Sequence, residues 1–317
     1  MPAALTAQAP RLGCATNPHW LASGTSVGVI AMRTLPQVTK RVAVVTGASR
    51  GIGRALTERL RAAGMTVAAI GRSGTDLNDV AVQTGAVPFV LDVANPGAVE
   101  EVFGRIEGEL GVPDLLVNNA GVSGGSGGTW ELSQQDWWQV LEINVRGTYL
   151  CTRAVLAPMM ARGSGRIINI SSGAATSPVG LDNDSVMNSA YMASKAAVNR
   201  FTEAVAGECF NSGVRVFSLS PGKVKTDMTA GLFADQWDDA DTWTSVEKAL
   251  DLITDLDAGL LDALSGRYFR AAIDDWRELS VRSDEVISED TNVLRLSQLL
   301  TSGSVDESPS RSAPGAT

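Results

Sequence analysis

The chain has 317 residues, of which 44% are hydrophobic and 19% are charged, and its formal net charge is -9 at pH 7. This composition is that of an ordinary globular protein, and the acidic balance argues against nucleic acid as a partner, because phosphate binding needs a basic face. The cysteines Cys14, Cys151 and Cys209 are few and far apart. They fit neither a disulfide framework nor a zinc site, so we expect inert thiols in a reducing, cytoplasmic compartment.

The single histidine, His19, lies in an N-terminal stretch with no clear element. Hydrolysis by a serine or cysteine nucleophile therefore has no base in the core, and a histidine-based metal site is excluded. We expect no metal, and any chemistry must use tyrosine, lysine, serine, asparagine or carboxylates.

The first 39 residues contain no acidic residue and scatter proline, glycine, serine and threonine. Residues 12–32 lack charged side chains, but polar residues break the stretch too often for a membrane span or a clear signal peptide. We expect a disordered extension over residues 1–39, with Met32 as a natural start, so that removing residues 1–31 leaves folding and activity intact.

From Arg41 the chain alternates short apolar runs, typical of strands buried on both faces, with stretches of helical periodicity. The predicted strands are 42–45, 66–70, 86–91, 115–117, 165–170, 214–219 and 266–271. Two of the predicted helices are long, 134–161 and 191–211. The alternation predicts one α/β domain over residues 40–301, a doubly wound Rossmann-type parallel sheet of about seven strands with helices on both faces.

Residues 226–264 are acidic and helical in pattern, and they include Trp237 and Trp243. They have no certain place on the sheet. A lid on the substrate side, over about 227–264, and a pair of ordinary surface helices are both open. Residues 302–317 are rich in serine and proline and predict a disordered tail.

The first strand leads directly into a glycine-rich turn, after which a helical pattern begins. The turn contains Gly47, Ser49, Arg50, Gly51 and Ile52. A strand, such a turn and a helix N-terminus form an anion site, because backbone N–H groups and the helix dipole converge on a phosphate. Three glycines alone would also fit a plain turn.

Five motifs occur in one order: the glycine loop, Asn118-Asn119-Ala120-Gly121, Ser172, Tyr191-x-x-x-Lys195 and Pro221-Gly222. With them the chain resembles the short-chain dehydrogenase/reductase family, single-domain oxidoreductase branch, closely over about 41–226 and loosely beyond. The resemblance implies hydride transfer between a nicotinamide cofactor and a small-molecule carbonyl or alcohol. The alternative is a non-catalytic NADP(H)-binding redox sensor, which would keep the glycine loop but lose the tyrosine or the lysine.

The resemblance implies further cofactor contacts, each with a plainer alternative. They are Asp92 and Val93 at the adenine, Asn119, Ala120 and Gly121 behind the adenosine ribose, and Pro221, Gly222, Val224 and Thr226 at the nicotinamide. Asp92 could instead cap a helix, and the segment after Pro221 could be a strand-ending turn.

The second strand ends in Ile70-Gly71-Arg72, without the acid that holds the ribose hydroxyls in a NAD site. Guanidinium groups of Arg72 and Arg50 suit a 2′-phosphate, so NADP(H) is predicted over NAD(H). The alternative is that Arg72 is a solvated surface charge.

Tyr191 and Lys195 are four residues apart near the start of a predicted helix, so their side chains point the same way. A nearby ammonium favours the phenolate, so we expect Lys195 to lower the pKa of Tyr191 and to hold the nicotinamide ribose. Tyr191 is then the general acid/base. A tyrosine packed above a solvated lysine is the alternative.

Two more catalytic residues are implied. Ser172, rather than its neighbour Ser171, is expected to bind the substrate oxygen, unless it is only a strand-end turn residue. Asn144 resembles the asparagine that holds a water near the lysine in a proton relay, or it is a satisfied core residue. Ser172 and Tyr191 are 19 positions apart, about six more than in many relatives, and we place the extra residues in 178–188.

Relatives use the surfaces of the two long helices to form dimers and tetramers, so a homodimer or homotetramer is expected. Trp130, Trp137 and Trp138 could serve that interface or the core. We expect the protein to bind neither a membrane nor a nucleic acid.

Overall fold

The computed structural model describes residues 40–125, 127–177 and 188–295. The predicted N-terminal extension, the C-terminal tail and nearly all of the predicted insertion at 178–188 lie outside these ranges.

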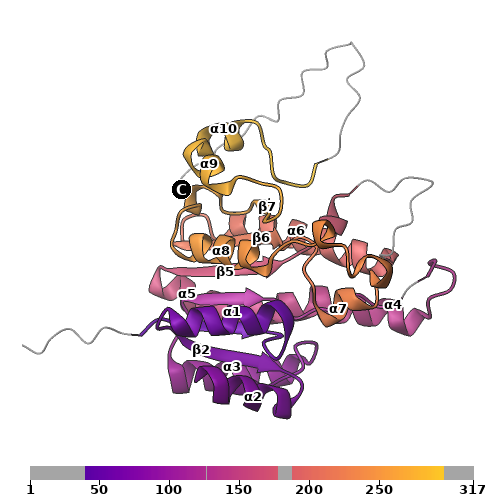
Figure 1. The fold of residues 1–317 in the computed structure, drawn as a ribbon. Helices are drawn as coiled ribbons and strands as arrows, with labels where there is room; N and C mark the ends of the chain where they lie inside the picture. Colours follow the sequence, from indigo (N-terminus) through magenta and orange to yellow (C-terminus); the bar gives the residue numbers. More distant parts are fainter. Residues whose placement is uncertain (1–39, 126, 178–187, 296–317) are drawn as a thin grey trace, which may run out of the picture. The chain divides into compact units, whose positions relative to one another are not determined.

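Seven parallel strands form one sheet in the order β3-β2-β1-β4-β5-β6-β7 (Figure 1). The strands are β1 (Val42–Thr46), β2 (Thr66–Gly71), β3 (Val87–Val90), β4 (Leu115–Asn118), β5 (Gly165–Ile170), β6 (Val214–Ser220) and β7 (Tyr268–Arg270). The order reverses between β1 and β4, which is the switch point where such sheets bind ligands. The predicted doubly wound Rossmann-type sheet is confirmed.

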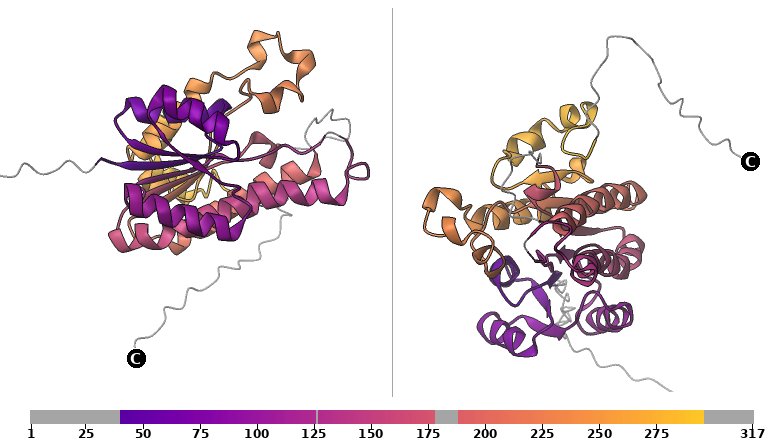
Figure 2. Two further views of the ribbon diagram at one scale, coloured as in Figure 1. Left: turned by 90° about the horizontal axis from the view of Figure 1, so that it is seen from below. Right: turned by 90° about the vertical axis from the view of Figure 1, so that its right-hand side faces the viewer.

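Helices cover both faces of the sheet (Figure 2, left). They are α1 (Gly51–Ala62), α2 (Gly74–Thr84), α3 (Pro96–Leu110), α4 (Gln134–Leu141), α5 (Gly147–Arg162), α6 (Ser189–Glu208), α7 (Asp227–Ala230), α8 (Val246–Asp257), α9 (Trp276–Val281) and α10 (Ser283–Ser288). One apolar cluster joins the sheet to α1 and α8, and the other joins it to α3, α5 and α6. The central strands are therefore buried from both sides, which explains why β1 and β4 are almost entirely apolar.

The segment after β6 corrects one expectation. From the sequence, a lid and a pair of surface helices are both open for residues 227–264, and neither describes α8, which packs in the core, where Leu250, Leu252, Ile253 and Leu256 are buried against one face of the sheet. Residues 227–245, with α7 and two single-turn 3₁₀ helices, project away from the sheet (Figure 2, left, orange). The apolar residues of α8 recur at helical spacing and so form one face of the helix, which must pack against other apolar side chains.

The long helix predicted over 134–161 consists of α4, α5 and a π-helical turn, Glu142–Arg146, between them. Asn144 lies in this turn and is buried. A π turn inside an α-helix is rare and frequently marks a functional site.

Candidate active site

A cavity of about 680 Å³ lies where the carboxyl ends of the strands meet the loops that follow them. All of the predicted cofactor and catalytic residues except Asn144 line it. They are Gly47, Ser49, Arg50, Gly51, Ile52, Arg72, Asp92, Val93, Asn119, Ala120, Gly121, Ser172, Tyr191, Lys195, Pro221, Gly222, Val224 and Thr226. Motifs far apart in the sequence thus share one site.

The glycine loop is shaped by backbone positions that only glycine fits well. Gly47 and Gly51 have φ angles of 66° and 54°, in the left-handed region. A Cβ atom on Gly53 would overlap the carbonyl oxygen of Gly47 and come within 2.5 Å of Asn119 Nδ2. The Asn119 amide donates to the carbonyl oxygens of Thr46 and Gly47, at 2.9 and 3.1 Å, so the asparagine motif after β4 fixes the loop after β1.

Tyr191 and Lys195 lie in the first two turns of α6, and both side chains are buried. Asn188 begins this helix as its N-cap, because its side-chain oxygen accepts a hydrogen bond of 2.9 Å from the Tyr191 amide. Its amide group donates to the Ser123 carbonyl oxygen at 3.0 Å and also to the Gly125 carbonyl oxygen. Asn188 therefore fixes the start of α6 against the loop after β4.

Burial moves the pKa values of both side chains. It raises the pKa of the Tyr191 hydroxyl, and a hydrogen bond with the Ser172 side chain acts in the opposite direction. Burial also lowers the pKa of Lys195 to about 8. The net shift of the Tyr191 pKa is therefore upward and not downward as expected, because desolvation of the phenolate outweighs the hydrogen bond with Ser172, while the effect of Lys195 on this pKa stays a prediction.

Ser172 follows β5 and begins a single-turn 3₁₀ helix, Gly173–Ala175. Its hydroxyl oxygen accepts a hydrogen bond of 3.2 Å from the Ala174 amide. Ser171 is buried instead, and its hydroxyl donates to the Lys195 carbonyl oxygen at 3.2 Å. Of the two serines, Ser172 is the one whose hydroxyl interacts with Tyr191.

Asn144 lies beside the cavity and not on its wall. Its amide group donates to the Val122 carbonyl oxygen at 2.9 Å and to the Ser194 hydroxyl at 3.0 Å, and its oxygen accepts from the Val122 amide at 2.9 Å. A Cβ on Gly121 would lie 3.2 Å from Asn144 Oδ1 and 3.5 Å from Lys195 Nζ. The side chain thus clamps the loop after β4 to α6, close to the lysine.

The charged residues predicted at the adenosine end, Arg50, Arg72 and Asp92, are exposed. Arg72 follows β2 and forms no ion pair with any residue that the structure describes. Arg50 pairs with Asp227 at 3.1 Å, and both side chains are about 70% exposed, at 72% and 69%. Asp92 accepts a hydrogen bond of 3.0 Å from the Ala94 amide, so it caps a turn and also faces the cavity.

Several lining residues escaped the sequence analysis. The apolar side chains of Met192, Met228, Phe233 and Ile273 also line the cavity. No motif marks these residues, although Met228 and Phe233 fall in the predicted substrate-side segment. Asn188 could have been found, because an asparagine three residues before Tyr191 is an N-cap signal.

The described ranges contain no group of three or more potential metal ligands, and no helix in them is long and apolar enough to cross a membrane. Cys151 and Cys209 are buried and free, and burial raises the pKa of Cys151 to about 12.

Known proteins resemble this chain in sequence and in structure. The pattern of the family described as short chain dehydrogenase matches residues 41–237. A short chain dehydrogenase of Pseudocercospora fijiensis is 38% identical over 61% of this chain and 63% of its own length, so the match spans just under two thirds of that relative. The short chain dehydrogenase pigC of Monascus ruber is 33% identical over 78% of this chain and 83% of its own.

A solved structure supports the same assignment. The crystal structure of a putative NAD(P)-dependent gluconate 5-dehydrogenase from Beutenbergia cavernae, with bound NADP, has a TM-score of 0.64 and 31% identity, and covers 74% of this chain and 96% of that one. With the family pattern over more than half of its length and the motifs of that pattern around one cavity, this chain belongs to the short-chain dehydrogenase/reductase family.

Proposed function

We propose that the protein is an NADP(H)-dependent oxidoreductase that interconverts a carbonyl compound and an alcohol. The observation that carries the proposal is the convergence of Tyr191, Lys195 and Ser172 on the cavity that the glycine loop also lines. Carbonyl reduction needs three groups: a hydroxyl that can move a proton, a cation, and a hydrogen-bond donor.

The lining of the cavity fits a nicotinamide dinucleotide. The loop after β1 leads into the N-terminus of α1 and presents glycine backbone where Cβ atoms would intrude, as a pyrophosphate site requires. Arg50 and Arg72 offer cations for the adenosine end, and Val224 and Thr226 also line the cavity. When bound, a reduced nicotinamide supplies the hydride.

The chain's own residues would handle the substrate oxygen and its proton. Tyr191 is protonated at neutral pH, since burial raises its pKa, so it can donate the proton that a reduced carbonyl oxygen needs. Ser172 would donate a hydrogen bond to the same oxygen and stabilise its developing charge. Lys195, with a pKa of about 8, is charged in most molecules at neutral pH and would hold the ribose hydroxyls.

The proton on Tyr191 must be replaced after each reduction. We place Asn144 in that relay as a residue that positions Lys195. Its side-chain hydrogen bonds to Val122 and Ser194 join the loop after β4 to the helix that carries Lys195. Its backbone carbonyl accepts from the Thr148 hydroxyl at 2.8 Å.

The preference for NADP(H) is supported by charge. Arg72 is exposed at the end of β2, where a NAD site has an acid, and its guanidinium is available to a 2′-phosphate. The second cation, Arg50, pairs with the exposed carboxylate of Asp227, and exposed ion pairs contribute little to stability.

A screen of aldehydes, ketones and secondary alcohols, followed at the absorbance band of reduced nicotinamide, tests the proposal. Turnover with NADPH supports an oxidoreductase. Tight NADPH binding without turnover of any compound would overturn it in favour of a nucleotide-binding sensor.

We also propose a cytoplasmic homodimer or homotetramer built on the helices 134–162 and α6. Trp138 on α4 and Tyr149 on α5 are 62% and 46% exposed, while the Trp137 indole donates to the Ser189 hydroxyl at 3.1 Å. Trp130, at 87% exposure, lies outside the core. Sedimentation of the purified chain measures the oligomeric state, and a monomer at micromolar concentration would contradict this assignment.

A further inference from the structure

The hydroxyl group of Tyr268 lies directly behind Ser172. Tyr268 is the first residue of β7, it is buried, and its hydroxyl donates a hydrogen bond of 3.0 Å to the Ser172 carbonyl oxygen. The same oxygen accepts from the Ala175 amide at 3.1 Å. Tyr268 therefore holds the first residue of the turn that presents the Ser172 hydroxyl to the cavity.

Tyr268 keeps its proton. Burial raises the pKa of its hydroxyl, and hydrogen bonds with the side chains of Ser220 and Thr176 oppose that effect. A hydroxyl that stays protonated remains a donor to Ser172 over the range in which Tyr191 works. Tyr268 itself is not among the residues that line the cavity.

The backbone of Tyr268 is fixed by a segment near the end of the described chain. Its amide donates to the Asn292 carbonyl oxygen at 2.8 Å, and the Asn292 side chain donates to the Tyr268 carbonyl oxygen at 2.9 Å. In the described sheet β7 is an edge strand, so Asn292 occupies backbone groups that a further strand would otherwise take. Asn292 has a φ of 58°, a conformation that asparagine tolerates better than most residues.

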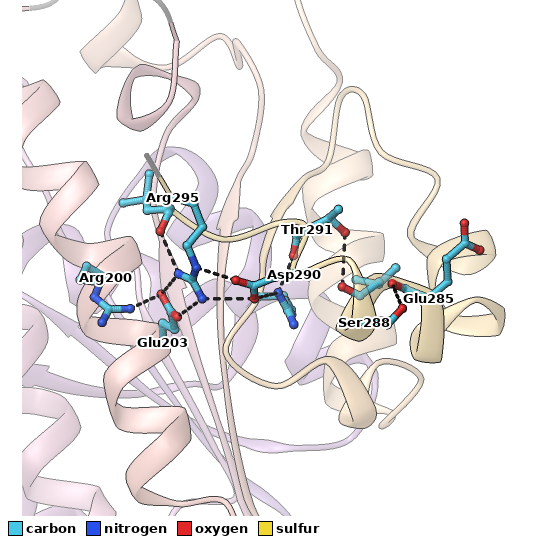
Figure 3. Close-up of polar contacts among 10 residues, drawn as sticks. Arg200, Glu203, Glu285, Ser288, Asp290, Thr291 and Arg295 are labelled. Atoms are coloured by element: carbon cyan, nitrogen blue, oxygen red, sulfur yellow. Dashed lines mark hydrogen bonds and ion pairs between the residues drawn. The ribbon is translucent and has the colours of Figure 1, made fainter. Parts of the chain in front are cut away.

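Charged side chains hold this segment in place (Figure 3). Arg295 pairs with Asp290 at 2.6 Å and with Glu203 on α6 at 2.8 Å. The nearly buried Arg267, next to Tyr268, donates to the Thr291 carbonyl oxygen at 2.6 Å and to Asp290 at 3.2 Å. We call Asp290, Asn292 and Arg295, with their partners Arg267 and Glu203, the C-terminal clasp.

We propose that Tyr268 is a positioning residue for Ser172, and that the C-terminal clasp holds Tyr268 in place by tying β7 to α6. The clasp then joins the strand behind Ser172 to the helix that carries Tyr191 and Lys195. The geometry of a catalytic hydrogen bond tolerates displacements of only about 0.5 Å, which gives such a support a kinetic effect. This inference rests on the proposed function of the same site.

The first test is Tyr268→Phe, which removes the donor and keeps the ring. We expect kcat to fall about tenfold while the KM and Kd for NADPH change less than about twofold, because the turn at Ser172 loosens and the glycine loop does not. The matched control is Ser280→Ala, which removes a hydroxyl on α9 that also donates to a backbone carbonyl oxygen, that of Arg277, and should leave kcat unchanged. An unchanged kcat in Tyr268→Phe, or an equal loss in the control, would overturn the assignment.

The second test addresses the clasp. Arg295→Gln should lower kcat roughly two- to fivefold, since Arg295 is half-exposed and its ion pairs are correspondingly weak. Arg282→Gln is the control, because Arg282 pairs only with Glu278 and Glu285 among the described residues. The double variant Tyr268→Phe/Arg295→Gln should lose no more than Tyr268→Phe alone, and fully additive losses would show that the clasp does not act through Tyr268.

A readout without turnover separates this inference from the proposed function. Hydrogen exchange of the Ala174 and Ala175 amides, which donate to the hydroxyl and carbonyl oxygens of Ser172, should become faster in Tyr268→Phe. If the wild-type protein reduced no carbonyl compound, the proposed function would be wrong, but the exchange rates would still test the role of Tyr268. Unchanged exchange at both amides would refute it even in an active enzyme.

Discussion

The Lys195 ammonium nitrogen lies 5.7 Å from the centre of the Tyr191 ring and donates a hydrogen bond of 2.8 Å to the Ile170 carbonyl oxygen. Both side chains are buried, and burial raises the pKa of Tyr191 while it lowers that of Lys195 to about 8. The pair therefore combines a firmly protonated phenol with a lysine whose charge is lost in weakly alkaline solution.

Tyr191→Phe should abolish turnover and leave NADPH binding nearly intact. The change removes the proton donor but keeps the ring, which is buried in the first turns of α6. Steady-state kinetics and a fluorescence titration with NADPH measure the two properties. Residual turnover within about tenfold of the wild-type rate would show that another group donates the proton.

Lys195→Met should change how stability depends on pH. In the wild-type protein the folded pKa of about 8 lies below the ordinary value of 10.5, so between these pH values the unfolded chain binds more protons and stability rises with pH. The shift corresponds to about 3 kcal/mol in the free energy of unfolding. Below pH 8 the cost of burying the ammonium is present in full.

Urea unfolding between pH 7 and pH 11 measures the free energy of unfolding of the wild-type and Lys195→Met proteins. Groups that titrate alike in both proteins cancel when one curve is subtracted from the other. The wild-type curve minus the Lys195→Met curve should rise across that window and then level off. Lys248→Met, at an exposed lysine on α8, is the control. A flat difference for Lys195→Met would contradict a buried, perturbed lysine.

Arg72→Asp should shift the cofactor preference from NADP(H) toward NAD(H). The new carboxylate would repel a 2′-phosphate, and losing a charged hydrogen bond corresponds to a change of about 10- to 100-fold in the ratio of kcat/KM values for NADPH and NADH. Arg105→Asp, at an exposed arginine of α3 outside the cavity, is the control. An unchanged ratio would mean that Arg72 is a solvated surface charge.

Asp227→Asn should tighten NADPH binding by a few-fold. The change releases Arg50 from its ion pair of 3.1 Å while the side chain at the start of α7 keeps its size. The gain is small because both partners are exposed and screened. Equal tightening for NADH would show that Arg50 binds a phosphate that the two cofactors share, and no change at all would show that Arg50 does not contact the cofactor.

Gly53→Ala should weaken cofactor binding by more than about tenfold, because the added methyl group would overlap the Gly47 carbonyl oxygen and displace the loop. Gly207→Ala is the matched control on α6, where a Cβ atom meets open space. It should raise the free energy of unfolding by about 0.5–1 kcal/mol and leave binding unchanged. Equal NADPH dissociation constants for the two variants would contradict the tight fit at Gly53.

The sequence determined those parts of this protein that depend on local order along the chain. The apolar run that forms β1 and the glycine loop between β1 and α1 can be recognised without a structure, because a strand buried on both faces and a tight turn each restrict their own residues. Tyr191 and Lys195 could likewise be placed on one helical face from their spacing alone.

Only the tertiary structure decided how segments distant in the sequence act on one another. It placed α8 in the core, used the Asn144 side chain to clamp the loop at Val122, and brought Tyr268 behind Ser172. It also reversed the expected direction of the Tyr191 pKa shift, because desolvation depends on everything that surrounds a group in space. Spacing along a chain specifies which side chains share a face, whereas burial and long-range hydrogen bonds exist only once the sheet has assembled.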